Sequence, residues 1–151
     1  MSESQIEDTR LLLPGLAGFY RRAIPISWLV IRVAVGFTLF MHGWPKILAG
    51  PAASAPRLEQ MGLPNGALWA WADFLIEFGG GIGVMLGLFT RFFAAAAAIE
   101  MAVIMVLYIP NGYQWTNRGY EFVLMWGLLC FAIALRGGGP YSLDRRIGVQ
   151  L

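Results

Sequence analysis

Residues 67–109 read ALWAWADFLIEFGGGIGVMLGLFTRFFAAAAAIEMAVIMVLYI, and nearly all of them are apolar. A helix needs about 20 apolar residues to cross the roughly 30 Å of hydrocarbon in a bilayer. The stretch is long enough for two such helices, at about residues 67–88 and 92–109. Only Phe89, Thr90 and Arg91 separate them, and so short a connection joins neighbouring antiparallel helices. The stretch therefore predicts two consecutive membrane spans.

Two further apolar segments flank this pair, at about residues 23–48 and 119–135. A soluble all-helical core is the competing interpretation, and it requires a polar face of helical period on some of the segments. Each segment is instead apolar around most of its circumference, with a few isolated charges. We therefore expect an all-α integral membrane protein, built as an antiparallel bundle of four transmembrane helices.

The composition narrows the class of protein further. Of the 151 residues, 58% are hydrophobic and 13% are charged, against about half and about a quarter in an average soluble domain. That balance excludes a disordered chain. The net charge of +2 is not gathered in a basic block, so we expect no nucleic-acid partner. The single cysteine, Cys130, cannot form an internal disulfide or a zinc site, and no metal is expected.

The basic residues predict the orientation of the chain, because cytoplasmic loops carry an excess of Lys and Arg. The larger group lies on one side of the predicted bundle and consists of Arg10, Arg21, Arg22, Arg91, Arg136, Arg145 and Arg146. The smaller group lies on the other side and consists of Lys46, Arg57 and Arg118. Both termini are therefore expected in the cytoplasm (N-in/C-in). Residues 1–22 then form an N-terminal tail, either with a short interfacial helix or disordered, residues 23–136 the transmembrane domain and residues 137–151 a C-terminal tail.

Three charged residues, Arg32, Glu77 and Glu100, lie deep in the predicted spans. Insertion of such a residue at the centre of a membrane helix costs about 2.5–3.5 kcal/mol. A rise of about 1.5 Å per residue places all three roughly 9–16 Å from the cytoplasmic end of their spans, so we expect them to form one charged core. One cation against two carboxylates predicts that one carboxyl group holds or shares a proton. The competing interpretation is that these charges only hold the helices in register.

A second polar group is expected nearer the outer surface. Asp73 lies four residues before Glu77 on the same helix face, and it can meet His42, Lys46 and Glu121 there. Histidine is the side chain that titrates nearest neutral pH, so His42 is the residue best suited to handle a proton. The competing interpretation is a histidine that only forms interfacial hydrogen bonds.

Glycines recur every four residues at Gly79, Gly83 and Gly87, on the face away from Asp73 and Glu77. Small residues at this spacing let helices approach closely in a membrane. We interpret these glycines as a helix-packing stripe, which also offers a contact between the subunits of a homo-oligomer.

Several short motifs follow one another along the chain. In order they are Arg32 with Gly36, His42-Gly43-x-x-Lys46, Met61-Gly62-Leu63-Pro64, Glu77-x-Gly79-Gly80, Gly87-Leu88-x-Thr90-Arg91, Tyr120-Glu121 and Tyr141-Ser142-Leu143-Asp144. This ordered set resembles the DoxX family of small four-span bacterial membrane proteins. The resemblance covers about residues 24–146, and the acidic, Leu-rich N-terminal extension lies outside it. It implies a multi-pass protein of the bacterial cytoplasmic (inner) membrane.

The same resemblance leads to the first functional hypothesis, a membrane subunit of a quinone-linked oxidoreductase complex. The family takes its name from a subunit of a thiosulfate:quinone oxidoreductase. The expected proton-handling, catalytic residues are His42, Lys46, Asp73, Glu77 and Glu121, and the expected quinone-contacting aromatics are Trp44, Trp69 and Tyr120. The chain has no flavin, haem or iron–sulfur motif and hence no intrinsic cofactor, so a redox partner protein must supply the electrons.

Two other classes of function remain open at this stage. One is a small-solute or proton transport unit that uses the charged core of Arg32, Glu77 and Glu100 as a relay. The other is a passive membrane anchor or assembly factor without an activity of its own.

Overall fold

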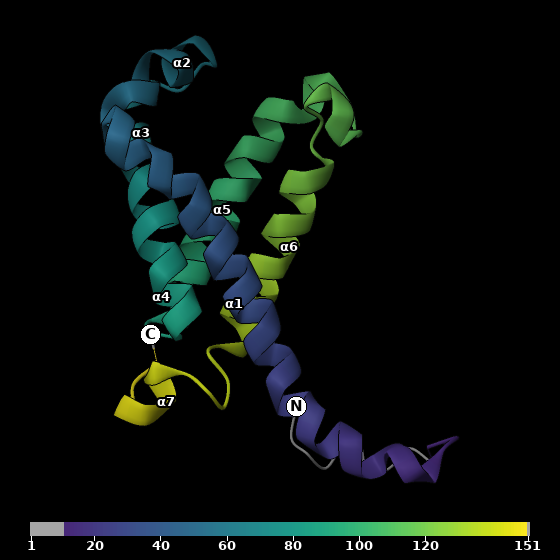
Figure 1. Ribbon diagram of the computed structural model, residues 1–151. Helices are drawn as coiled ribbons and strands as arrows, with labels where there is room; N and C mark the ends of the chain where they lie inside the picture. Colours follow the sequence, from purple (N-terminus) through teal and green to yellow (C-terminus); the bar gives the residue numbers. More distant parts are fainter. Residues whose placement is uncertain (1–10, 151) are drawn as a thin grey trace.

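The computed structural model describes residues 11–150, and all the regular elements among them are helical (Figure 1). The long helices are α1 (Ala17–Ala49), α5 (Thr90–Tyr108) and α6 (Glu121–Arg136). Between α1 and α5 lie η3 (Pro51–Ser54), α2 (Ala55–Gln60), α3 (Gly66–Phe74), η4 (Leu75–Gly80) and α4 (Gly81–Leu86). The remaining elements are the short turns η2 (Pro14–Leu16), η5 (Ile109–Asn111) and η6 (Trp115–Asn117), and the last helix α7 (Leu143–Ile147). The all-α prediction is confirmed for this part of the chain.

Successive long segments run between the two ends of the molecule, and both described ends of the chain lie at the same end of it (Figure 1). Two helical stretches are long and apolar enough to cross a membrane, Pro14–Ala49 with 36 residues and Thr90–Asn111 with 22. The other two predicted spans are less regular. Helix α6 has only 16 residues, about 24 Å of rise, and the segment of residues 66–86 is divided into three elements.

Helix α1 begins at Ala17, several residues before the predicted start of the first span. Its first turns run at a steep angle to the rest of the helix in Figure 1, where they are purple. Pro25 lies inside α1 and removes a backbone donor there, which is a common cause of a helix bend. The short helix predicted before the first span is therefore continuous with α1 and forms its bent first part. Leu16 and Phe19 are exposed there. Residues 1–10 of the predicted tail lie outside the described residues.

The second predicted span is interrupted by a π-helical turn. Residues 75–80 form η4, between α3 and α4, and Glu77 lies within it. A π-turn accommodates one extra residue, and such turns are frequent at functional sites. The segment then ends at Gly87, whose φ of +70° is left-handed and stops the helix.

This π-turn also alters the predicted glycine stripe, because the extra residue breaks the four-residue register. Gly83 faces the ring of Phe93, whereas a Cβ added to Gly79 would meet nothing within 4 Å, and Gly87 lies beyond the helix end. Within the single chain the three glycines therefore do not form one packing face, and their role as a contact between subunits stays a prediction. Close helix packing occurs instead between Gly36 and Gly81, where a Cβ added to Gly81 would lie 2.5 Å from the backbone nitrogen of Phe40.

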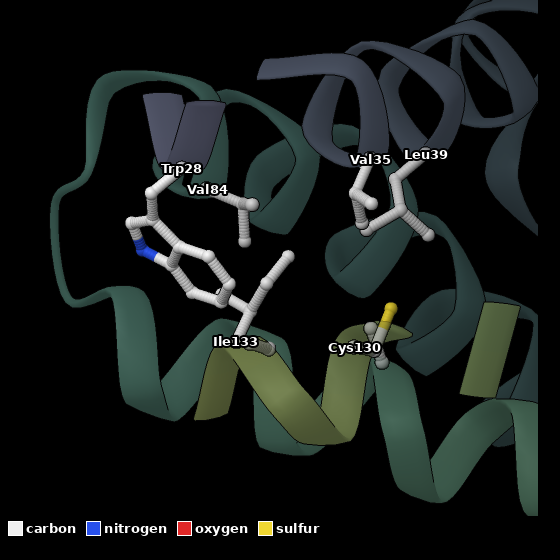
Figure 2. Packing of buried hydrophobic residues seen from close by; sticks show 8 residues of the cluster. Trp28, Val35, Leu39, Val84, Cys130 and Ile133 are labelled. Carbon is white, nitrogen blue, oxygen red and sulfur yellow. The ribbon is translucent and has the colours of Figure 1, made fainter. Parts of the chain in front are cut away.

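The helices pack as two pairs. Helix α5 packs mainly on α6, and α1 packs mainly on α4 and η4. A buried hydrophobic cluster joins the pairs near the end where the chain begins and ends; Figure 2 labels Trp28, Val35, Leu39, Val84, Cys130 and Ile133 from this cluster. Towards the other end, where α2 lies, the pairs diverge (Figure 1). The space between them contains the candidate site.

Candidate functional site

A cavity of about 870 Å³ lies between the two helix pairs. Its walls come from α1, α3 and η4 on one side and from α5 and α6 on the other, and residues 54–63 contribute to its outer end. Aliphatic and aromatic side chains form most of the lining, among them Ile76, Ile104 and Trp126. The charged side chains Lys46, Asp73, Glu77 and Glu100 also line this cavity. An apolar cavity with a few convergent polar groups is the usual form of a small-molecule site.

Lys46 on α1 forms ion pairs with two acidic side chains across the helix contact. Its Nζ lies 2.5 Å from Glu77 Oε2 and also pairs with Asp73 Oδ2. The glycine one turn before it makes this possible, because Gly43 lies directly against the backbone of Phe78 and lets α1 approach η4. Glu77 retains 8% of its side-chain exposure, while Lys46 and Asp73 retain 22% and 23%. The sequence predicts Glu77 in the deep charged core and Lys46 and Asp73 in the outer polar group. The structure brings these three side chains into one cluster.

Glu100 on α5 completes this cluster from the opposite wall. Carboxylate oxygens of Asp73, Glu77 and Glu100 lie within 4.8 Å of one another. Both oxygens of Glu100 are buried, and neither accepts a hydrogen bond from another protein group. Three carboxylates are a donor set that hard divalent cations favour. Lys46 already neutralises part of this charge, so the side chains present fit an ammonium group and shared protons, and we assign no metal.

His42 lies one turn before Lys46 on α1 and lines the same cavity. Its Nδ1 is 2.8 Å from the backbone carbonyl oxygen of Thr38, in the preceding turn. The side chain is exposed rather than enclosed by other residues. The expected group of His42, Lys46 and Asp73 is therefore brought to one cavity, although the proton-handling role of His42 remains a prediction.

Other predicted site residues lie elsewhere. Glu121 accepts a hydrogen bond from the backbone N–H of Trp115 at 3.2 Å, in the loop that precedes α6, and it does not line the cavity. Tyr120 packs edge-on against Tyr113 in the same loop. Both residues precede or begin α6, and the connection of residues 109–120 forms its own hydrogen bonds, such as that from the Tyr120 N–H to the Gly112 carbonyl. This local order keeps them away from α1 and α3.

The aromatic lining also differs from the prediction. Trp69 lines the cavity as expected, but Trp44 packs on the rings of Phe40 and Phe78 outside it. Sequence reasoning missed Trp126 on α6 and the role of Tyr108 on α5, which both line the cavity. The sequence did contain a pattern that could have indicated Trp126. Phe122 lies four residues before it, so the two aromatic side chains share one helix face, and both line the cavity.

Arg32 was predicted to form a charged core with Glu77 and Glu100. It lies instead outside the cavity, against the segment that follows α6. It is 1% exposed, and its Nη1 and Nη2 donate hydrogen bonds of 2.8 Å to the carbonyl oxygens of Gly138 and Tyr141. The predicted layer is therefore wrong, because Arg32 satisfies the carbonyls that follow the end of α6. These carbonyls belong to the connection between α6 and α7, where a buried backbone carbonyl needs a hydrogen-bond donor from elsewhere in the fold.

The C-terminal segment around these carbonyls is folded against the helices. Asp144, 1% exposed, accepts hydrogen bonds from the N–H groups of Phe89 and Thr90, at 2.7 and 3.0 Å, and from Thr90 Oγ1 at 2.7 Å. These donors belong to the start of α5, where backbone N–H groups have no partner within the helix. Asp144 thus caps α5 from a position 54 residues away.

Comparisons with known proteins agree with the membrane character of the helices. The DoxX family model matches residues 27–109. The inner membrane protein YqjF of Escherichia coli is 32% identical over 123 residues, which cover 80% of this chain and 91% of that protein. An uncharacterized membrane protein of Mycobacterium tuberculosis is 28% identical over 136 residues, 82% of each chain. No solved structure matches the chain significantly.

The matched residues include the whole cavity cluster. Residues 27–109 contain Lys46, Asp73, Glu77 and Glu100, and they extend through α5. The family model covers more than half of the chain, and YqjF is similar along most of its length. This chain is therefore a member of the DoxX family of membrane proteins.

Proposed function

We propose that this chain crosses the bacterial inner membrane four times with both termini in the cytoplasm, and that its cavity binds a quinone as the membrane subunit of an oxidoreductase complex. The four-span topology is supported by the chain's course in Figure 1, where α1, the segment α3–η4–α4, α5 and α6 alternate in direction. Both described ends lie at the same end of the molecule as the first turns of α1 and as α7 (Figure 1), and these elements contain Arg21, Arg22, Arg145 and Arg146. This distribution agrees with the excess of basic residues in cytoplasmic segments.

The cavity is the observation that carries the proposed ligand. Its volume of about 870 Å³ lies within the 300–1,000 Å³ typical of sites for small organic molecules. A quinone has an apolar tail and a ring with polar oxygens. The aliphatic and aromatic walls suit the tail and ring, and the cluster of Lys46, Asp73, Glu77 and Glu100 places polar groups at one part of an otherwise apolar cavity.

The cluster also has the chemistry that a quinone reaction requires. Reduction of a quinone to a hydroquinone consumes two electrons and two protons. Carboxyl groups and an imidazole can hold and transfer these protons, and Asp73, Glu77, Glu100 and His42 all line the cavity. The electrons must come from a redox partner protein, because the sequence carries no motif for an electron-carrying cofactor. The chain's own part is therefore to bind the ring, exclude water and manage protons.

Transport is the weaker alternative. It depended on a relay through Arg32, and Arg32 is instead hydrogen-bonded to the carbonyls of Gly138 and Tyr141. A hydrophobic cluster that includes Val35, Leu39 and Val84 lies at this end of the helices. Nothing in this arrangement favours a polar path across the described residues. The third class of function, a passive membrane anchor or assembly factor, differs from the proposed function in that such a protein would bind no ligand in the cavity.

Binding to nanodiscs tests the proposal. The purified protein in nanodiscs is equilibrated with decylubiquinone, captured, and its bound quinone is extracted and quantified against empty nanodiscs. Ala96 on α5 lines the cavity, whereas Ala102 on the same helix is exposed and does not. We expect saturable binding that Ala96→Phe weakens at least tenfold, because the ring occupies part of the cavity that the ligand needs, and that Ala102→Phe leaves unchanged. Equal effects of the two variants, or no binding above empty nanodiscs, would overturn the proposal.

A further inference from the structure

We infer that the cavity selects the reduced, hydroxyl-bearing form of its ligand, a hydroquinone, and that His42 Nε2 accepts a hydrogen bond from one of its hydroxyl groups. This inference rests on the proposed quinone site and specifies its ligand further. A quinone and its hydroquinone have nearly the same size and shape. They differ at two oxygens, which only accept hydrogen bonds in the quinone and can donate them in the hydroquinone.

The orientation of His42 defines which of its nitrogens can accept. A backbone carbonyl oxygen can only accept a hydrogen bond, so the 2.8 Å contact with the Thr38 carbonyl requires the hydrogen to be on Nδ1. In the neutral imidazole the other nitrogen, Nε2, then carries the free lone pair. His42 lines the cavity and is exposed, so this acceptor is available to a ligand.

The rest of the cluster adds further acceptors and uses up its donor. Lys46 Nζ donates to Asp73 and to Glu77, which leaves it at most one further N–H. The three carboxyl groups of Asp73, Glu77 and Glu100 together provide six oxygens. The two oxygens of Glu100 receive no hydrogen bond from the protein. A proton shared between two of these carboxyl groups occupies two oxygens and leaves the others free to accept.

This excess of acceptors distinguishes the two redox forms. A quinone carbonyl placed against His42 Nε2 or a carboxylate oxygen would pair an acceptor with an acceptor, which leaves both without a donor and is unfavourable away from water. A hydroquinone hydroxyl supplies the missing donor at the same position. Sites built to bond a ligand hydroxyl reject analogues that lack it for this reason.

The test compares both redox forms in the same nanodisc assay. Decylubiquinone is used in its oxidised form and, under argon after chemical reduction, as decylubiquinol. We expect decylubiquinol to bind about tenfold more tightly than decylubiquinone, the factor that one additional net hydrogen bond supplies. His42→Asn keeps an amide N–H in reach of the Thr38 carbonyl but lacks the Nε2 acceptor, so the preference should fall to about onefold. Phe37→Leu, at an exposed position of the same helix that does not line the cavity, should preserve it.

The outcomes separate this inference from the proposed function. Binding of both forms with equal affinity overturns the selection for hydroquinone and leaves the quinone site standing. A preference that persists in His42→Asn overturns the role of His42. Binding of neither form above empty nanodiscs overturns the quinone site itself. A preference that is present in the unmodified chain and in Phe37→Leu, and absent in His42→Asn, supports the inference.

Discussion

Lys46 and Glu77 form an ion pair between α1 and η4, with Nζ 2.5 Å from Oε2. Two local features place these side chains together. Gly43 lets α1 approach the backbone of Phe78, and the π-turn of residues 75–80 carries Glu77 on the facing element. The pair lies in the wall of the cavity, where Asp73 joins it. A largely buried ion pair adds little to the free energy of unfolding while it is intact. Removing one partner lowers that free energy strongly, because the other charge is left buried without compensation.

Loss of Lys46 is therefore expected to destabilise the fold. Lys46→Met leaves Asp73 and Glu77 without their counter-cation and should lower the free energy of unfolding by about 3 kcal/mol. Adding Glu77→Gln to this variant should restore part of the loss, because it removes one uncompensated carboxylate. Unfolding of the detergent-solubilised proteins in increasing SDS measures the effect. Equal stability of Lys46→Met and the unmodified chain would show that the ion pair is not formed.

Arg32 is expected to hold the C-terminal segment rather than to act in the cavity. Arg32→Met removes both hydrogen bonds to the Gly138 and Tyr141 carbonyls and should lower the free energy of unfolding by about 3 kcal/mol. Hydrogen exchange should accelerate in residues 137–150 before it does in α5. Arg146→Met, at an exposed position of α7, serves as the control and should have little effect. Unchanged exchange in residues 137–150 of Arg32→Met would contradict the assignment.

Asp144 and Thr90 should be energetically coupled. The carboxylate accepts from the Thr90 hydroxyl at 2.7 Å and from its N–H at 3.0 Å. Thr90→Val removes only the hydroxyl bond, while Asp144→Asn weakens all the bonds to the carboxylate. We expect a coupling energy of about 1 kcal/mol in a double-mutant cycle of unfolding free energies. Additive effects of the two substitutions would mean that the hydroxyl bond is absent.

The two glycines Gly79 and Gly81 should respond in opposite ways to a methyl group. A Cβ at Gly81 would lie 2.5 Å from the backbone nitrogen of Phe40, so Gly81→Ala must separate α1 from α4 and should cost about 1–3 kcal/mol. A Cβ at Gly79 meets nothing within 4 Å, so Gly79→Ala should be neutral or slightly stabilising, since alanine favours a helix. Thermal unfolding in detergent compares the variants. A larger loss for Gly79→Ala would restore the predicted glycine stripe.

Much of the fold followed from hydrophobic patterning. The long apolar runs predicted the helices that became α1, α5 and α6, with boundaries that differ by a few residues. The π-turn could not be predicted in this way, because an apolar run of this length gives the same pattern with and without one inserted residue. Its effect on register also explains why Gly79, Gly83 and Gly87 do not form one face.

The candidate site was predicted in part. His42, Lys46 and Asp73 were expected together and line one cavity, and Glu77 and Glu100 were expected to be near each other. The placement of Arg32 could not be derived from its depth, because its partners are backbone carbonyls of a distant segment. Carbonyl groups have no signature in a sequence. The same limit applies to Asp144, which belongs to the motif of residues 141–144 and caps α5 through backbone N–H groups.

The most direct test of the central claim, a quinone site between the two helix pairs, is photoaffinity labelling with an azido-substituted quinone in nanodiscs. After irradiation, mass spectrometry locates the modified residues. We predict labelling at cavity-lining residues of the second pair, such as Met101 on α5 and Trp126 on α6, and loss of this labelling when decylubiquinone is added in excess. Labelling that excess decylubiquinone does not reduce, at exposed residues such as Phe92 and Phe131, would contradict the account.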